Sequence, residues 1–271
     1  MKFSVLMSIY SKEKSNYFNE AMHSIWDDQI VRPDQIVLVQ DGPLNFNLYK
    51  DISYWQKKLK DVLLIVPLKS NLGLALALNE GLNFCKFNFI ARMDTDDVST
   101  PCRFQKQVQF LEDNANIDVV GSFISEIDEC NNIVKKLVKF PLDHDNLMKF
   151  FSKRDPFAHP AVMFRKSFFN KAGFYDNSVF FAEDTLLWYQ GFMNDCKFSN
   201  LDIIGLKFRR TSDFYERRSG LVKSLNLLKF RIFVINRNLG YGVFANIYAI
   251  IYFALSISPR IVKKITYNWL R

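Results

Sequence analysis

Three carboxylates fall within four residues of this chain, at Asp94, Asp96 and Asp97. The mostly apolar residues 87–90 before them predict a strand, and Ser99-Thr100-Pro101 after them predict the start of a helix. The acids would then lie at the carboxyl end of a strand, where open α/β sheets bind ligands. Carboxylates this close repel one another unless a cation lies between them, and Mg²⁺ or Mn²⁺ prefers such oxygen ligands. A solvated acidic loop or a helix cap is the alternative interpretation.

Two further acidic positions follow predicted elements in a similar way. Asp41 follows the apolar residues 36–39 and Gln40, and it precedes Gly42-Pro43 in a strong turn signal. Glu183 and Asp184 open a predicted helix, where the helix dipole favours acids whatever their function. Asp41 can line the same crevice as the three-carboxylate cluster.

The elements that would position these acids alternate along the first third of the chain. Apolar runs predict strands at 3–9, 36–39, 62–66 and 87–93, separated by helical spacing over 16–29, 48–59 and 74–85. This alternation predicts an α/β fold with a parallel sheet between two layers of helices. Further helices are expected at 101–115, 143–152, 166–172 and 182–194, further strands at 118–124, 133–140, 160–164 and 203–209, and tail helices at 221–236 and 241–257.

Composition is that of a globular protein with one large domain, or one domain and an appendage. The 271 residues are 49% hydrophobic and 24% charged. Cys85, Cys102, Cys130 and Cys196 lie far apart without a C-x-x-C motif, which argues against a zinc site and for reduced thiols. Residues 1–9 are too short an apolar run for a signal peptide and are better explained as a first strand.

The net charge of +8 is concentrated near the C-terminus. Residues 207–271 contain 13 Lys and Arg against 2 Asp and Glu, so that the remaining chain is close to neutral. Long apolar runs interrupt the basic residues, which favours an anionic membrane surface over nucleic acid. The run at 241–257 is shorter than the roughly 20 residues of a spanning helix, so an interfacial helix is expected. A helix packed on the catalytic domain is the alternative.

An ordered series of short motifs runs over residues 3–215. The motifs are Ser4–Tyr10, Val37–Gly42, Asn71-x-Gly73, Ala77–Leu82, Ala91–Asp97, Pro101-x-Arg103-Phe104, Asp118–Gly121, His159-Pro160, Gly173-Phe174 and Glu183-Asp184. In this order they resemble the family-2 inverting glycosyltransferases of the GT-A fold, and most of all the small bacterial enzymes that extend the lipid-linked O-antigen repeat unit. The chain lacks a Gln-x-x-Arg-Trp motif, which argues against a processive synthase, and has Gln40 where the family often has an acid.

This resemblance implies an activity and a division of the chain. Residues 1–218 would form the GT-A catalytic domain, with a nucleotide-binding half at 1–100 and an acceptor half at 101–218, and 219–271 a helical membrane-associating segment. The enzyme would transfer glucose or galactose from a UDP-sugar, with inversion, to a GlcNAc- or GalNAc-diphospho-undecaprenol acceptor. The linkage would be β, commonly β-1,3. The protein would be peripheral on the cytoplasmic face of the bacterial inner membrane.

The resemblance also implies roles for the acids. Asp96 would bind Mn²⁺ or Mg²⁺, Asp94 would contact the metal or the ribose, and Asp97 would orient the loop or cap the next helix. Asp184 would be the general base for the acceptor hydroxyl. Asp41 would accept from the uracil N–H, although a turn-forming role competes.

Other side chains would contact the substrates. Asn71 and Arg92 could position the nucleotide, and Arg92 could equally be a structural partner of the acids. The acceptor or its phosphates would be contacted by Glu183, His159, Trp188, Arg209, Arg210 and Arg217. For Trp188 the alternative is ordinary core, and for the arginines a solvated basic surface instead of phosphate binding.

Two rival functions remain at the level of sequence. A nucleotidyltransferase also combines an α/β sheet with metal-bound acids, but its glycine-rich phosphate loop is missing from Ile9-Tyr10-Ser11-Lys12. A non-enzymatic basic protein that binds membranes or nucleic acid would explain the tail and leave Asp41, Asp94, Asp96 and Asp184 without a function.

Overall fold

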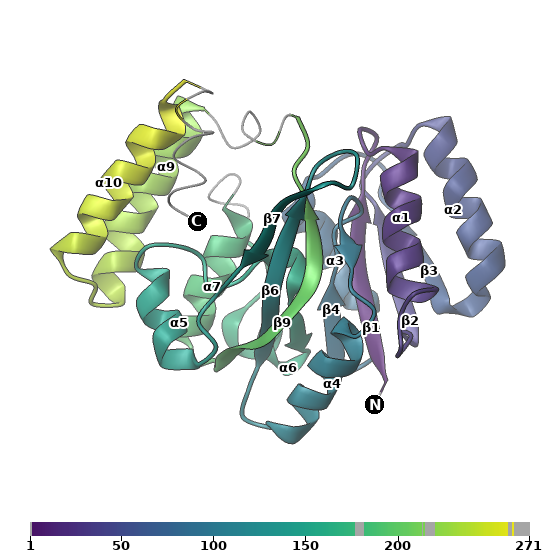
Figure 1. The fold of residues 1–271 in the computed structure, drawn as a ribbon, viewed down its shortest axis with the longest axis horizontal. Coiled ribbons are helices and arrows are strands. Elements are labelled where there is room, and N and C mark those ends of the chain that lie inside the picture. The colour runs from purple at the N-terminus through teal and green to yellow at the C-terminus, as the bar shows by residue number, and fades with distance from the viewer. Residues whose placement is uncertain (1, 177–181, 213, 215–219, 260–261, 263–271) are drawn as a thin grey trace.

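A computed structural model describes residues 2–176, 182–212, 214, 220–259 and 262. These residues form a nine-stranded sheet of order β3-β2-β1-β4-β8-β6-β9-β5, with β7 paired to β6 (Figure 1). The predicted α/β class is confirmed. The parallel pairs lie within β3-β2-β1-β4 and between β6 and β9, and antiparallel pairs join these two groups into one sheet.

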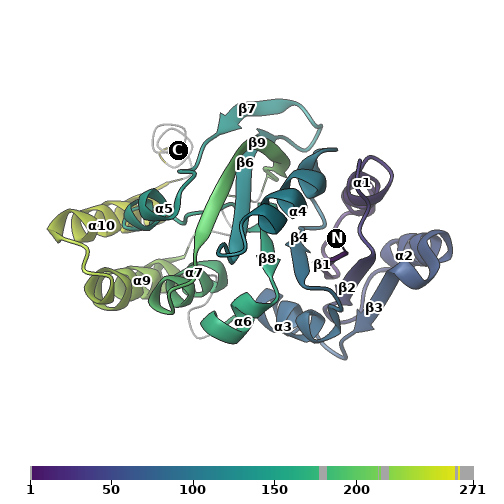
Figure 2. The same ribbon diagram turned by 90° about the horizontal axis from the view of Figure 1, so that it is seen from below.

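The first half is the predicted alternation of strands and helices. Its strands are β1 (Phe3–Ile9), β2 (Gln35–Gln40), β3 (Leu63–Pro67) and β4 (Phe89–Arg92). Its helices are α1 (Ser15–Trp26), α2 (Phe46–Leu59), a 3-10 turn (Lys60–Val62) and α3 (Leu74–Phe84). Side chains alternate along a strand, so Val5 and Met7 of β1 pack in one core cluster with α1 and α2, and Leu6 packs with α3 in the other. Helices therefore cover both faces of this sheet half (Figure 2).

The second half completes the sheet. It contains β5 (Val98–Ser99), α4 (Arg103–Asp113), β6 (Val119–Ile127), β7 (Ile133–Val138), α5 (His144–Phe151), β8 (Met163–Arg165), α6 (Ser167–Ala172), α7 (Glu183–Met193) and β9 (Phe198–Arg209). Two expectations were wrong. The helix expected from Pro101, with a start signal at Ser99-Thr100-Pro101, begins only at Arg103, and Ser99 lies in β5 because β9 supplies an antiparallel partner, Leu206. The strand expected from Pro160 begins only at Met163, after a 3-10 turn at His159–Ala161.

The tail forms two helices that pack side by side. They are α9 (Leu221–Phe230), continued by a π-helical turn (Arg231–Asn236), and α10 (Val243–Ile257). Arg231 donates to the carbonyl of Phe151 at 2.7 Å and pairs with Asp155 at 2.7 Å, so the tail is anchored beside α5 (Figure 1). These contacts hold the first tail helix on the catalytic domain, whereas α10, the helix for which that alternative was raised, packs on α9 and the π-helical turn. Within the described ranges, no helix combines the length and apolar character that a membrane span requires.

Candidate active site

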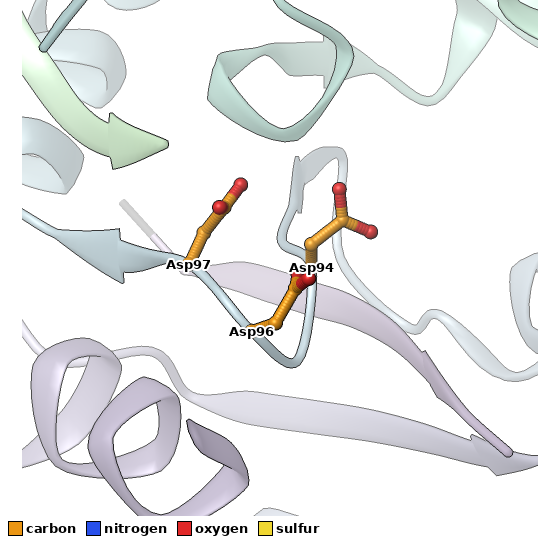
Figure 3. A group of neighbouring side chains, drawn as sticks. All are labelled: Asp94, Asp96 and Asp97. Atoms are coloured by element: carbon orange, nitrogen blue, oxygen red, sulfur yellow. The ribbon is translucent and has the colours of Figure 1, made fainter. Parts of the chain in front are cut away.

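The three carboxylates of the predicted cluster meet on the loop between β4 and β5. One ligand oxygen from each of Asp94, Asp96 and Asp97 lies within 4.8 Å of the others. Figure 3 shows Asp94 and Asp97 pointing the same way from the two arms of this loop, with Asp96 at its turn. The β4 strand ends at Arg92, so the loop lies at the carboxyl end of a parallel strand, as the sequence predicts.

The donor set fits a hard divalent cation. All three side chains offer oxygen, the ligand type of Mg²⁺ and Mn²⁺. Burial, and then the charges of Asp96 and Asp94, raise the pKa of Asp97 well above its usual value. The Oδ2 atom of Asp97 is buried and has no hydrogen-bond partner among the described residues. A cation between the carboxylates would relieve both the repulsion and this unsatisfied acceptor.

Arg92 is the positive neighbour of this cluster. It is 1% exposed and forms an ion pair with Asp94. Burial opposes its charge, but Asp94 raises the pKa of the guanidinium, so that Arg92 stays ionised. Its Nε and Nη2 atoms have no hydrogen-bond partner within the described part of the chain. The expected structural pairing with the acids is therefore present, whereas the contact with a nucleotide stays a prediction.

Asp41 and Asn71 join the loop after β2 to the loop that leads from β3 into α3. Asp41 is 4% exposed, and its two carboxylate oxygens accept from the backbone N–H groups of Leu72 (2.7 Å) and Gly73 (3.1 Å). Asn71 donates to the carbonyl of Asp41 at 3.2 Å. The carboxylate of Asp41 therefore has a structural role, which is to hold the backbone of the loop before α3. Each carboxylate oxygen can accept a second bond, so the uracil contact remains a prediction.

Glu183 and Asp184 begin α7, and electrostatics connects them to the acid loop. Burial raises the pKa of Glu183, which Arg92 lowers and Asp94 raises further. The backbone N–H of Thr185 donates to Asp184 at 2.8 Å, as is usual for an acid in a first helical turn. The structure therefore brings the two predicted acid groups into one electrostatic neighbourhood, although they are about 90 positions apart in sequence.

Tyr175 interacts electrostatically with both groups and was not singled out from the sequence. Its hydroxyl lies 2.8 Å from Nε2 of His159, and its backbone exchanges two hydrogen bonds with the side chain of Asn79 at 2.8 and 2.9 Å. Burial raises its pKa, with Asp184 and other nearby acids adding to the shift. His159 is buried beside it, so the predicted acceptor contact of His159 is instead an internal pair. Asn79 belongs to the motif Ala77–Leu82, and this motif was the only feature of the sequence analysis that pointed to the contact with Tyr175.

Trp188 is a core residue, which agrees with the alternative interpretation and does not support stacking on the acceptor sugar. The side chain is 0% exposed. Its ring stacks on Phe164 at 5.9 Å between centroids and meets Phe157 edge-on at 4.9 Å. These contacts leave no ring face for a sugar. The sequence could not decide this, because helical spacing in α7 does not distinguish a buried aromatic side chain from one that binds a ligand.

The basic cluster after β9 is engaged with protein groups. Arg209 is 1% exposed and donates from its side chain to Asp96, Asp128, Asn131 and Glu20. Arg210 pairs with the buried Glu126 at 3.2 Å. Arg217 lies outside the described residues. A direct phosphate contact from Arg209 is therefore not supported, since its guanidinium nitrogens already donate to protein oxygens.

A second buried arginine supports the end of β4 and was quoted only as part of a motif. Arg103 donates through Nη2 to the carbonyls of Arg92 (2.8 Å) and Val162 (3.2 Å). Its Nε donates to Gln107 at 3.1 Å, and Gln107 donates onward to the carbonyl of Ala161 at 2.8 Å. Helix α4 thus holds the strand end from which the acid loop starts.

Comparison with known proteins agrees with this geometry. A family model described as glycosyl transferase family 2 matches residues 4–171. The amylovoran biosynthesis glycosyltransferase AmsE of Erwinia amylovora is 37% identical over 218 residues, 80% of each chain. An Escherichia coli protein named UDP-Gal:alpha-D-GlcNAc-diphosphoundecaprenol beta-1,3-galactosyltransferase is 32% identical over 230 residues, 84% of this chain and 81% of its own.

Solved structures show the same fold. TarS 1–349 of S. aureus, in complex with UDP-GlcNAc, superposes with a TM-score of 0.62 at 18% identity, covering 97% of this chain and 83% of that one. The family model covers more than half of the chain, and two relatives above 30% identity span most of it. The chain therefore belongs to glycosyl transferase family 2 and is a glycosyltransferase with a GT-A-like fold.

Proposed function

We propose that this enzyme transfers one hexose, glucose or galactose, from a UDP-sugar to a GlcNAc- or GalNAc-diphospho-undecaprenol acceptor. The transfer inverts the anomeric centre and forms a β linkage, β-1,3 in the simplest case, during O-antigen or related surface polysaccharide synthesis. The activity for which the Escherichia coli relative is named supports this donor and acceptor class. The observation that carries the proposal is the three-carboxylate loop together with the acidic start of α7.

The acids divide the chemistry between them. Asp94, Asp96 and Asp97 would hold Mn²⁺ or Mg²⁺, which supplies positive charge to the leaving diphosphate. Asp184 would accept the proton of the acceptor hydroxyl. In the same displacement the hydroxyl oxygen of the acceptor bonds to the anomeric carbon, and the bond from that carbon to the oxygen of UDP breaks. Burial raises the pKa of the neighbouring Glu183 carboxyl, which supports a general base at the start of α7.

The donor's base and ribose would lie beside Asp41 and Asn71. Asp41 follows β2, and Asn71 lies in the loop that leads from β3 into α3; one strand, β1, separates β2 from β4, which carries the acid loop. Ligands of open α/β sheets bind at such strand ends. The catalytic domain would span residues 1–218, with its nucleotide-binding half at 1–100, and the tail 219–271 would serve the membrane.

The membrane contact would use the outer side of α10. Val243, Phe244, Ile247, Ile250 and Ile251 are 45–86% exposed and follow helical spacing on one side of the helix; we call them the apolar face. Contiguous exposed apolar surface of this kind marks an interaction site. Residues 220–259 contain four Lys and Arg and no acid, which suits anionic lipid. The enzyme would be peripheral on the cytoplasmic face of the bacterial inner membrane, where its lipid-linked acceptor lies.

The activity is tested with a panel of UDP-sugars and a synthetic GlcNAc- or GalNAc-diphospho-lipid, in Mn²⁺, Mg²⁺ or EDTA. We expect metal-dependent transfer from a single UDP-hexose, and product NMR gives the linkage. Asp184→Asn should bind UDP normally and lose transfer, because only the base is changed. Transfer that is insensitive to EDTA, or that uses a different nucleotide as carrier, would contradict the proposal.

The membrane contact is tested by substitution, because truncation near Asn200 would remove most of β9. Phe244→Ser with Ile251→Ser should weaken binding to anionic vesicles about tenfold or more, since each side chain loses its transfer free energy. Phe46→Ser on α2, where the side chain is 81% exposed, is the matched control and should bind like the wild type. Equal binding by the double variant, or loss of self-association in its place, would reject a lipid contact.

A further inference from the structure

Arg209, the last residue of β9, connects the acid loop to two other parts of the chain, α1 and the turn between β6 and β7. Its Nε donates to the backbone carbonyl of Asp96 at 2.7 Å, and its backbone N–H donates to Oδ1 of Asp97 at 2.7 Å. These two bonds lie next to each other on the loop. They leave Oδ2 of Asp97, within the three-carboxylate group, without a hydrogen-bond partner in the described ranges.

The other end of the guanidinium is fixed to rigid neighbours. Nη2 pairs with Glu20 of α1 at 2.5 Å, and the guanidinium lies over the ring of Tyr17 at 4.3 Å. Nη1 donates to Asn131 at 2.7 Å and to the carbonyl of Asp128 at 3.2 Å, both in the turn between β6 and β7. That turn is itself closed by Asp128, whose Oδ1 accepts from two backbone N–H groups.

We propose that Arg209 is a positioning residue that holds the acid loop in the shape needed to bind a divalent cation. The inference rests on the proposed metal dependence. Three carboxylates within 4.8 Å repel one another, so the loop tends to open when no cation is bound. The charge of Arg209 is already compensated by Glu20, and its contact with Asp96 is to the backbone. Its effect is therefore on the geometry of the loop, which lowers the cost of gathering the carboxylates around the ion.

The test replaces Arg209 with lysine, which keeps the charge and the bond from the backbone N–H to Asp97. A lysine side chain cannot reach all four groups that accept hydrogen bonds from the arginine side chain. Arg165→Lys is the matched control. Arg165 also ends a strand, β8, and also donates to backbone carbonyls, of Ile117 (2.7 Å) and Asn114 (3.0 Å). It pairs with Phe89 at the amino end of β4, away from the acid loop.

Two readouts separate positioning from general stability. The first is Mn²⁺ binding in the presence of UDP, followed by electron paramagnetic resonance. The second is backbone amide exchange of residues 93–99 without metal. We expect Arg209→Lys to weaken Mn²⁺ binding about tenfold and to accelerate exchange of the loop, as for other residues that orient metal ligands. Arg165→Lys should leave both unchanged even where it lowers the melting temperature.

The proposal is overturned if Arg209→Lys binds Mn²⁺ and exchanges like the wild type, or if Arg165→Lys shows the same changes. Should Arg209→Lys fail to fold, Glu20→Gln decides in its place, with a smaller shift in the same direction expected. Wild-type protein that binds no Mn²⁺ with UDP would refute the metal part of the proposed function. In that case loop exchange alone decides whether Arg209 holds the loop.

Discussion

Asp94 and Asp96 should differ sharply in what they contribute to stability, although both are assigned to the metal site. Asp94 is the ion-pair partner of Arg92, whose side chain is 1% exposed. Asp94→Asn leaves that buried cation without its ion-pair partner. Asp96→Asn removes one of three mutually repelling charges, and the bond from Arg209 to the backbone carbonyl of Asp96 survives.

The size of the difference follows from burial. Removing one partner of a buried ion pair costs about 3–5 kcal/mol. The side chain of Asp94 is 31% exposed, so the loss for Asp94→Asn should be near the lower limit, about 3 kcal/mol. Asp96→Asn should stay within about 1 kcal/mol of the wild type, in the range of substitutions away from such pairs.

The assay is urea unfolding in EDTA, so that bound metal does not contribute. A loss of about 3 kcal/mol moves the midpoint by roughly 1 M for a protein of this size. Both variants should lose sugar transfer, which shows that the stability difference is separate from the shared catalytic role. Equal destabilisation of the two variants, or an Asp94→Asn variant as stable as the wild type, would refute the pairing of Arg92 with Asp94 as a stabilising contact.

Three further outcomes are expected. Burial, with Arg92 nearby, lowers the pKa of His159, so the folded state binds fewer protons than the unfolded state. The free energy of unfolding should therefore fall as the pH drops below about 6.5, by up to about 1.4 kcal/mol per pH unit. In His159→Gln the slope of unfolding free energy between pH 5 and 6.5 should decrease by that amount, and an unchanged slope would contradict the burial of a neutral imidazole. Gly42→Ala should lose more than about 1 kcal/mol and bind UDP more weakly, because φ is +85° and a Cβ would lie 2.6 Å from the backbone nitrogen of Asn71. Gly240→Ala, with φ +68° and nothing within 4 Å of a Cβ, is its control, and equal effects on UDP binding would count against the turn. A thiol reagent at pH 8 should label the exposed Cys130 before Cys85 and Cys196, because burial raises the pKa of Cys85 to about 12 and of Cys196 to about 11. Mass spectrometry of labelled peptides gives the order, and labelling of Cys85 or Cys196 before Cys130 would contradict the prediction.

Local features of the sequence determined most of the elements and the position of the acids. The first strand was expected at 3–9 and is Phe3–Ile9, because a continuous apolar run is a signal that neighbouring residues carry by themselves. The same holds for α3 and α7, whose helical spacing is local. Asp94, Asp96 and Asp97 directly follow a strand in the chain, so their place at the carboxyl end of that strand could be predicted without knowledge of distant partners.

Only the tertiary structure decided which side chains bind substrate and which hold the protein together. Arg209 pairs with Glu20 across 189 positions, and β5 exists because β9 lies beside it. Trp188 and His159 have the residue types of a sugar site, yet the packing of α7 buries both of them. The physical reason is that a side chain's burial and partners depend on contacts between segments far apart in the chain, which local spacing does not encode, whereas strand and helix formation depend largely on near neighbours.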